Sequence, residues 1–140
     1  MNIAIINGPN LNLLGKREPE VYGKETFETF LENLIEKFPN VQFKYFQSNV
    51  EGELVNAIQE YGFTTDGIIL NPAGYTHTSV AIGDAVAAVV SVVVEVHISN
   101  IFAREEFRKH SHVSAKCAGV ISGLGLKGYE LAVRYLMNSL

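Results

Sequence analysis

Polar side chains with acid–base and anion-binding chemistry crowd into one short segment. Glu95 and His97 lie at the end of an apolar, β-branched run at 91–96, and Arg104 and Arg108 follow within a few residues. Side chains on a strand alternate between its two faces, so Glu95 and His97 point the same way. A carboxylate and an imidazole exchange protons, and guanidinium groups bind anions through paired hydrogen bonds. These residue types at this spacing indicate a site for a small anionic substrate.

A purely structural interpretation of the same segment is also open. Glu95 would then form an ion pair with Arg104 or Arg108 at the strand end. Backbone groups would satisfy His97. The convergence of four polar functions on one strand end favours the site, because ligands of open parallel sheets bind in the crevice beyond the carboxyl ends of the strands.

The elements that would position these groups alternate strand and helix along the chain. Apolar runs predict strands at 2–7, 41–46, 67–70, 91–96 and 119–122, and helical spacing predicts helices at 26–38, 48–61, about 78–89 and 128–137. Strict alternation favours a doubly wound α/β fold, with helices on both faces of a parallel sheet. Five strands favour the flavodoxin-like order 2-1-3-4-5. Ser48 and Glu51 form a capping-box pattern, and Thr78 or Ser79 is expected to cap the next helix.

Composition narrows the class of protein. The length of 140 residues fits a single domain, 1–140. The content of hydrophobic residues, 47%, and of charged residues, 19%, is typical of globular proteins. A net charge of −4 without a basic block argues against a nucleic-acid partner. One cysteine, Cys117, fits a reducing compartment. The sequence shows no signal peptide and no apolar run of about 18 residues, so we expect a cytoplasmic protein without a membrane partner.

The loop at 8–24, after the first strand, carries two further candidates. They are Arg17 and Tyr22. The glycines are too widely spaced for a phosphate-binding loop. Loops of this length in compact domains are usually lids or disordered segments, and composition alone leaves both open.

The loop after the third strand carries an amide and an imidazole. Asn71 ends that strand, Gly74 permits close approach of the backbone, and His77 precedes the next helix. On its own, this segment favours a turn and a helix cap, in which His77 would have no functional role.

Neither a metal nor another cofactor is expected. His110 and His112 have no Cys or acid nearby and make a poor zinc site. The lysines lie outside the strand runs, so a buried Schiff-base lysine is not indicated. Cys117 is interpreted as an inert thiol.

Four segments together resemble type II 3-dehydroquinate dehydratase over nearly the whole chain. They are INGPNLNLLGKREPEVYG at 6–23, NPAGYTHTSVAIGDA at 71–85, EVHISNIFAREEFRKHS at 95–111 and GVISGLGLKGYELAVRYL at 119–136. The resemblance implies a flavodoxin-like fold and a cofactor-independent hydro-lyase. It implies dehydration of 3-dehydroquinate to 3-dehydroshikimate, by anti elimination through an enolate, in the shikimate pathway of aromatic amino acid biosynthesis.

The resemblance also implies roles for individual residues. Tyr22 would be the base that removes the proton next to the ketone, kept ionised by Arg17, and Asn10 would orient a water that stabilises the enolate. His97 would be the general acid for the departing hydroxyl, oriented by Glu95. The substrate contacts would come from Asn71, Gly74, His77, Asp84, Ile98, Ser99, Arg104 and Arg108.

A homo-oligomer is a further implication of the resemblance. Trimers would assemble into a dodecamer, and Asp84 would reach a neighbouring subunit's site. Members of the family usually have arginine before this aspartate, where this chain has Gly83. The chain therefore departs from the family pattern at that subunit contact.

Two other classes of protein remain as alternatives. A binding module for a small anion would keep Arg108 and the Ser99 backbone, and Tyr22 and His97 would be dispensable. An electron carrier of the same fold would need a hydroxyl-rich FMN phosphate loop after the first strand, where this chain has Asn, Leu and Pro.

Overall fold

A single all-parallel sheet organises the part of the chain that the structure describes. The computed structural model describes residues 1–16, 20 and 24–139. The five strands are β1 (Asn2–Asn7), β2 (Gln42–Gln47), β3 (Gly67–Asn71), β4 (Val92–His97) and β5 (Gly119–Ser122). They pair in the order β2-β1-β3-β4-β5, which confirms the predicted topology.

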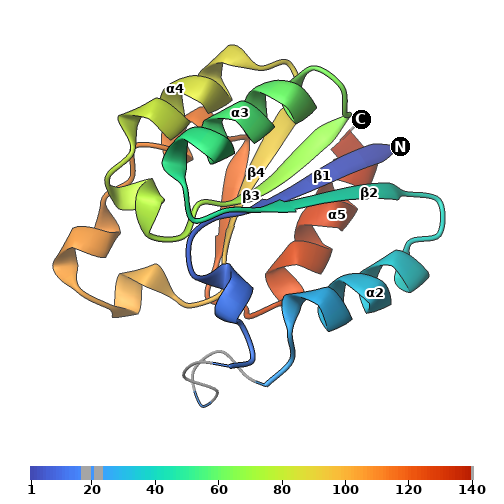
Figure 1. Cartoon of the computed structure of the whole chain (residues 1–140), viewed down its shortest axis with the longest axis horizontal. Coiled ribbons are helices and arrows are strands. Elements are labelled where there is room, and N and C mark those ends of the chain that lie inside the picture. The colour runs from blue at the N-terminus through green and yellow to red at the C-terminus, as the bar shows by residue number, and fades with distance from the viewer. Residues whose placement is uncertain (17–19, 21–23, 140) are drawn as a thin grey trace.

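Helices cover both faces of this sheet (Figure 1). On one face lie α2 (Phe27–Lys37) and α5 (Lys127–Ser139), and on the other lie α3 (Glu51–Gly62) and α4 (Val80–Ala88). Alternate strand residues therefore enter two separate cores: Ile5 packs in the first and Ile6 in the second. Burial on both faces explains why the strands are continuous apolar runs. No helix in the described ranges is long and apolar enough to cross a membrane.

Side-chain caps set the starts of some helices. Ser79 accepts a hydrogen bond from a backbone N–H in the first turn of α4, as predicted. The capping box predicted from Ser48 and Glu51 is wrong. Val50 occupies the N-cap of α3 and has no polar side-chain atom to cap it. The Ser48 hydroxyl instead donates to the carboxylate of Glu53 and accepts the backbone N–H of Val50.

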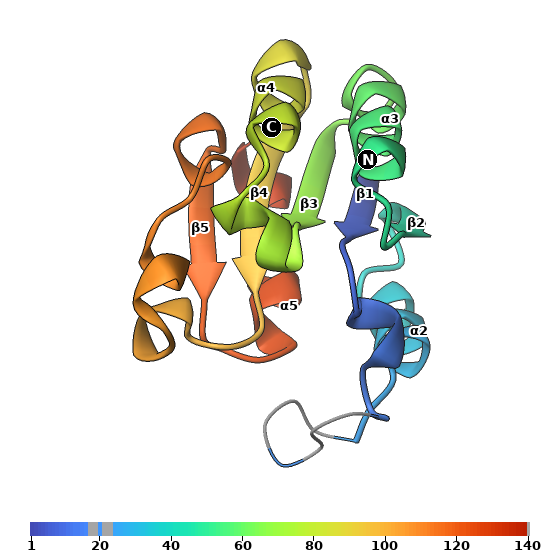
Figure 2. The same ribbon diagram turned by 60° about the vertical axis from the view of Figure 1, so that its left-hand side comes forward.

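Short 3₁₀ turns follow the carboxyl ends of three strands (Figure 2). These are η1 (Leu11–Leu13) after β1, η2 (Ala73–His77) after β3, and η3 (Ile101–Ala103) with η4 (Glu106–Lys109) after β4. A fifth, η5 (Ser114–Lys116), precedes β5. β4 ends one residue later than predicted because His97 still pairs with Ser122. The chain therefore delivers its polar loop residues to one edge of the sheet.

Glu130 on α5 binds three cations, of which Lys37 joins α5 to α2 and the other two lie on α5 itself. Its carboxylate accepts hydrogen bonds from Lys37 and Lys127 at 2.9 Å each and from Arg134 at 3.0 Å. The bond from Lys37, followed by the bond from Lys127, lowers the pKa of Glu130 from 4.5 to about 2. Ionised Glu130 is therefore bound more favourably in the folded state than in the unfolded state.

We expect Glu130→Gln to lower the free energy of unfolding by about 1–2 kcal/mol at neutral pH, because it breaks three partly exposed ion pairs. The folded-state pKa lies below the unfolded one, so this stabilisation is complete above about pH 4.5 and is lost as the pH falls towards about 2. Urea unfolding at a series of pH values should show the gap between wild type and variant narrowing below about pH 5. Glu32→Gln, exposed on α2, is the matched control. A gap that stays constant with pH would contradict the ion-pair explanation.

Candidate active site

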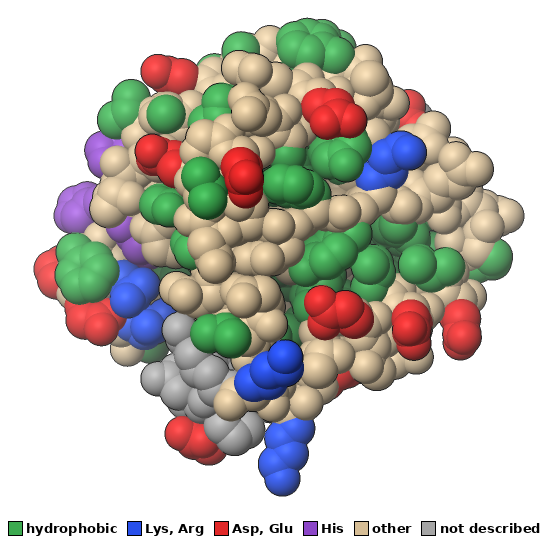
Figure 3. Space-filling model, viewed as in Figure 1, with side chains coloured by type: hydrophobic (Ala, Val, Ile, Leu, Met, Phe, Trp, Pro, Cys, Tyr) green, Lys and Arg blue, Asp and Glu red, His purple; other side chains and the backbone are tan. Residues whose placement is uncertain are grey.

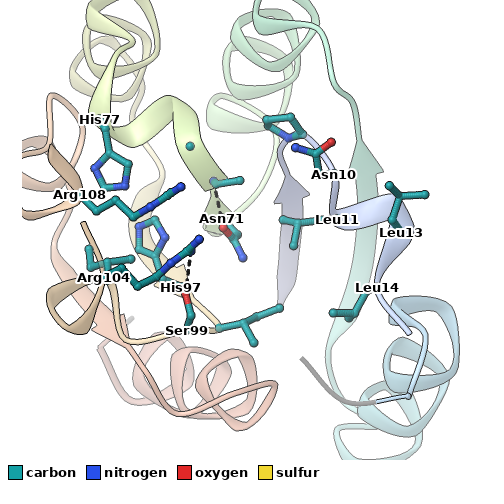
Figure 4. Close-up of a pocket in the computed structure, with 15 residues that line it drawn as sticks. Asn10, Leu11, Leu13, Leu14, Asn71, His77, His97, Ser99, Arg104 and Arg108 are labelled. Atoms are coloured by element: carbon teal, nitrogen blue, oxygen red, sulfur yellow. Dashed lines mark hydrogen bonds between the residues drawn. The ribbon is translucent and has the colours of Figure 1, made fainter. Parts of the chain in front are cut away.

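A cavity of about 250 Å³ opens at the carboxyl edge of the sheet, where β1, β3 and β4 end (Figure 4). Its walls come from residues 9–14, 71–77 and 97–108. Gly8 allows the first two walls to meet: its N–H bonds to the carbonyl of Asn71 at 2.7 Å, and a Cβ there would lie 2.7 Å from the carbonyl oxygen of Pro72. The cavity thus occupies the crevice in which open α/β sheets bind ligands.

Most of the site residues predicted from the sequence meet at this cavity. They are Asn10, Asn71, Gly74, His77, His97, Ile98, Ser99, Arg104 and Arg108. Glu95 lies beside His97 without lining the cavity, and Asp84 is exposed on α4, away from it. The predicted base Tyr22 and its partner Arg17 lie outside the described residues.

Glu95 and His97 form a buried pair under the cavity. His97 Nε2 donates a hydrogen bond to Glu95 Oε2. Glu95 is fully buried and His97 is 4% exposed. The structural alternative, in which Glu95 pairs with an arginine, is wrong: Arg108 bonds to Glu105 at 2.5 Å instead. Because Nε2 is committed to Glu95, Nδ1 is the imidazole nitrogen that remains to exchange a proton with a ligand.

Two hydroxyl groups complete the hydrogen bonding of Glu95. Thr76 Oγ1 donates to Oε2 at 2.8 Å and Ser114 Oγ donates to Oε1 at 2.7 Å. Burial opposes ionisation of Glu95, but the bond from His97, together with the two hydroxyls, leaves its pKa below the ordinary value. Glu95 is therefore a carboxylate that fixes the orientation of the imidazole.

Sequence reasoning did not identify these hydroxyl groups. Ser111 links them, since its Oγ lies 2.6 Å from Thr76 Oγ1 and accepts the backbone N–H of Ser114 at 3.0 Å. Thr76 is adjacent to His77, in the loop after the third strand that the sequence marked as a candidate, so its position could have pointed to it. Ser114 lies 19 residues from Glu95, and nothing in its local sequence marks it.

His77 supplies a second imidazole to the cavity. Its Nδ1 lies 2.7 Å from the carbonyl oxygen of His110, so this nitrogen carries a proton and donates it. Burial, followed by the charges of His97 and Arg108, lowers the pKa of His77 below its ordinary value. A neutral ring protonated on Nδ1 has an acceptor at Nε2, which suits a substrate hydroxyl. The rings of His77 and His97 stack with centroids 6.4 Å apart.

Two arginines make the cavity positive within an acidic protein. Arg104 donates to Ser99 Oγ at 3.3 Å, and the guanidinium of Arg108 lies 4.9 Å from the centre of the Phe107 ring. Among the described residues, no carboxylate lines the cavity. Basic and histidine side chains also lie together at one side of the surface in Figure 3. The arrangement concentrates positive charge where an anion would bind.

The remaining chemical candidates stay outside this site. In residues 1–16, 20 and 24–139, no three His, Cys, Asp or Glu side chains are grouped as a metal site requires. Burial raises the pKa of Cys117 to about 12, so its thiol is protonated and unreactive at neutral pH.

The fold and the site together define a class of protein. The topology is flavodoxin-like, and the crevice presents anion-binding arginines beside a buried acid–base pair. The chain belongs to the family described as dehydroquinase class II, whose model matches residues 1–137.

Individual relatives agree with this family. The chain is 55% identical over 144 residues to a 3-dehydroquinate dehydratase of Fusobacterium nucleatum, covering 99% of this chain and 97% of the relative. It is 52% identical over 140 residues to that of Bacillus pumilus, covering 98% and 95%. A type II dehydroquinase from Propionibacterium acnes matches the structure with a TM-score of 0.93 and 43% identity, over 98% of this chain and 96% of that one. These matches confirm the family resemblance. They exclude the two alternatives, an anion-binding module without turnover and an FMN-binding electron carrier.

Proposed function

We propose that this member of the class II dehydroquinases dehydrates 3-dehydroquinate with His97 as the general acid. The observation that carries the proposal is the buried Glu95–His97 pair at the floor of an arginine-lined cavity. Elimination of water requires a proton for the departing hydroxyl, and an imidazole held in one orientation is suited to deliver it. Glu95 would hold the His97 ring in one orientation towards the substrate.

The same walls supply contacts for the rest of the substrate. Asn71, His77 and Arg108, which line the cavity, would bond its hydroxyl groups, and Gly74 would allow the ring to approach the backbone of η2. The backbone N–H groups of Ile98 and Ser99 would take the substrate carboxylate, next to Arg104. In this proposal one set of residues contacts the hydroxyl groups of the substrate ring, and another set contacts its carboxylate.

The first step of the proposed reaction forms an enolate. A base removes the proton next to the ketone, and the electron pair moves onto the carbonyl oxygen. Asn10, whose amide faces the cavity in Figure 4, would orient a water towards that oxygen. The enolate then collapses, the carbon–oxygen bond on the opposite face breaks, and the proton of His97 leaves with the hydroxyl as water. The family resemblance assigns the base to Tyr22 and its ionisation to Arg17.

The test of this function is the appearance of the enone chromophore when purified protein meets 3-dehydroquinate. We expect turnover without any added cofactor, undiminished by chelators or by borohydride added with substrate, because the chemistry needs neither a metal nor an imine. Loss of activity with borohydride would indicate a Schiff base and would contradict the enolate mechanism. No enone at all would contradict the function itself.

We further propose a cytoplasmic homo-oligomer of single-domain subunits, in which trimers assemble into a dodecamer and Asp84 contacts a neighbouring site. The exposure of Asp84 on α4 supports this arrangement. This structure has no room for a side chain at position 83, because a Cβ there would collide with the carbonyl oxygen of His112. Light scattering tests the assembly, and a monomer would contradict it.

A further inference from the structure

A buried tyrosine hydroxyl lies directly beneath the substrate cavity. The Tyr129 hydroxyl on α5 donates to Asn7 Oδ1 at 2.8 Å and accepts from Asn71 Nδ2, also at 2.8 Å. Tyr129 and Asn7 are fully buried, and Asn71 is 3% exposed. Of these three residues, Asn71 alone lines the cavity.

The two asparagines occupy matching positions on neighbouring strands. Asn7 ends β1, Asn71 ends β3, and the two are partners in the parallel register. The strand order reverses between β1 and β3, so this is the switch point of the sheet, where doubly wound folds bind ligands. Tyr129 therefore bridges the two strands whose ends form the crevice.

The hydrogen bonds among Asn71, Tyr129 and Asn7 all run in one direction: Asn71 donates to Tyr129, and Tyr129 donates to Asn7. Burial raises the pKa of Tyr129 above its ordinary value, so its hydroxyl stays neutral and both donates and accepts. Its proton goes to Asn7, which leaves a lone pair for Asn71. A reversed Asn71 amide would place its oxygen against the Tyr129 oxygen, whose proton Asn7 accepts, and its NH2 group against the backbone N–H of Ala73.

Asn71 is fixed at its oxygen as well. Asn71 Oδ1 accepts the backbone N–H of Ala73 at 3.0 Å. Ala73 has a φ of 51°, a left-handed conformation that is unusual for a residue with a Cβ and that needs surrounding support. With its oxygen used by Ala73 and one N–H used by Tyr129, the side chain of Asn71 has its second N–H left for a ligand.

We propose that Tyr129 is a positioning residue: its hydroxyl orients the Asn71 amide so that Asn71 presents a donor to a substrate hydroxyl. This inference rests on the proposed substrate role of Asn71. Tyr129 itself touches no substrate and acts only through Asn71.

The ring of Tyr129 has a separate, structural role. It packs against Phe27 with centroids 5.0 Å apart and against Phe30 at 5.8 Å. A phenylalanine would fill the same place in this aromatic cluster. Packing therefore accounts for the ring, and the hydroxyl is the part that needs an explanation.

Tyr129→Phe isolates that hydroxyl. We expect the KM for 3-dehydroquinate to rise about 10-fold with kcat within about threefold of wild type, because the lost contact serves substrate and transition state alike. Tyr45→Phe is the matched control, since the Tyr45 hydroxyl lies 3.5 Å from Asn7 Nδ2. That variant removes a hydroxyl from the same cluster and leaves the Tyr129–Asn71 bond intact, so its KM should be that of wild type.

A double-mutant cycle distinguishes positioning from general destabilisation. Asn71→Ala should raise KM at least as much as Tyr129→Phe, and the double variant should be no worse than Asn71→Ala alone. Additive effects on KM, or a wild-type KM in Tyr129→Phe with only a lower Tm, would overturn the proposal while Asn71 kept its substrate role. A wild-type KM in Asn71→Ala would remove Asn71 from the substrate site and the positioning role with it. Absence of turnover in the wild type would instead be a failure of the proposed function.

A measurement on the wild type needs no folded variant. With 3-dehydroshikimate as the probe, the side-chain amide resonances of Asn71 should show one proton protected from exchange before addition and the other shifting on addition. Two rapidly exchanging protons would overturn the proposal.

Discussion

His97→Gln is expected to lower kcat by roughly 10²–10⁴-fold, the usual contribution of a general acid. Glutamine keeps a donor for Glu95 and so avoids leaving that buried carboxylate without a partner, but it cannot release a proton to the departing hydroxyl. Steady-state kinetics with 3-dehydroquinate measure the loss. Binding of 3-dehydroshikimate, followed by calorimetry, should change far less than kcat.

His112→Gln is the matched control for this variant. His112 is exposed, and its side chain does not line the cavity, so its kinetics should match those of wild type. If His97→Gln kept more than about a hundredth of the wild-type kcat, the smallest expected effect of an acid would be absent and another group would have to protonate the leaving hydroxyl.

Tyr22→Phe is expected to bring turnover close to background, a loss of roughly 10³-fold or more, because the variant keeps the ring and removes the proposed base. Affinity for 3-dehydroshikimate should be nearly unchanged. Tyr135→Phe, on the exposed side of α5, controls for loss of a tyrosine hydroxyl and should be fully active. Appreciable turnover in Tyr22→Phe would make His77 or His97 the next candidate for the base.

The companion variant Arg17→Ala tests how the base is ionised. A cation favours the ionised phenol, so its removal should move the acidic limb of the kcat profile to higher pH, towards the reference tyrosine pKa of about 10. A slower enzyme with an unmoved limb would assign Arg17 to substrate or lid positioning.

The sequence was a good guide to the strands because burial on both faces requires continuous apolar, β-branched runs. Helix starts were harder. Ser48 has the residue type and spacing of a capping box, but α3 begins at Glu51 and the Ser48 hydroxyl bonds to Glu53. The local sequence pattern does not show whether the Ser48 hydroxyl bonds to a backbone N–H of the helix or to the Glu53 side chain.

The site shows a similar division. Glu95 and His97 were conspicuous because charged residues at the end of a buried strand need partners. Thr76 and Ser114 are small hydroxyl residues, common in loops, and their contacts with Glu95 depend on how η2 and η5 pack. Tyr129 occupies an apolar helix position and looks like core from its spacing, although its hydroxyl bonds to Asn71 across 58 residues of sequence.

Gly83 couples α4 to the loop beside the acid–base pair. The carbonyl oxygen of His112 fills the space that any side chain at position 83 would need, and His112 lies between Ser111 and the Glu95 partner Ser114. A side chain at position 83 would push on His112 and so on the neighbouring Ser111 and Ser114, which bond around the acid–base pair. Position 83 on α4 is therefore coupled through residues 111–114 to Glu95, although it does not line the cavity.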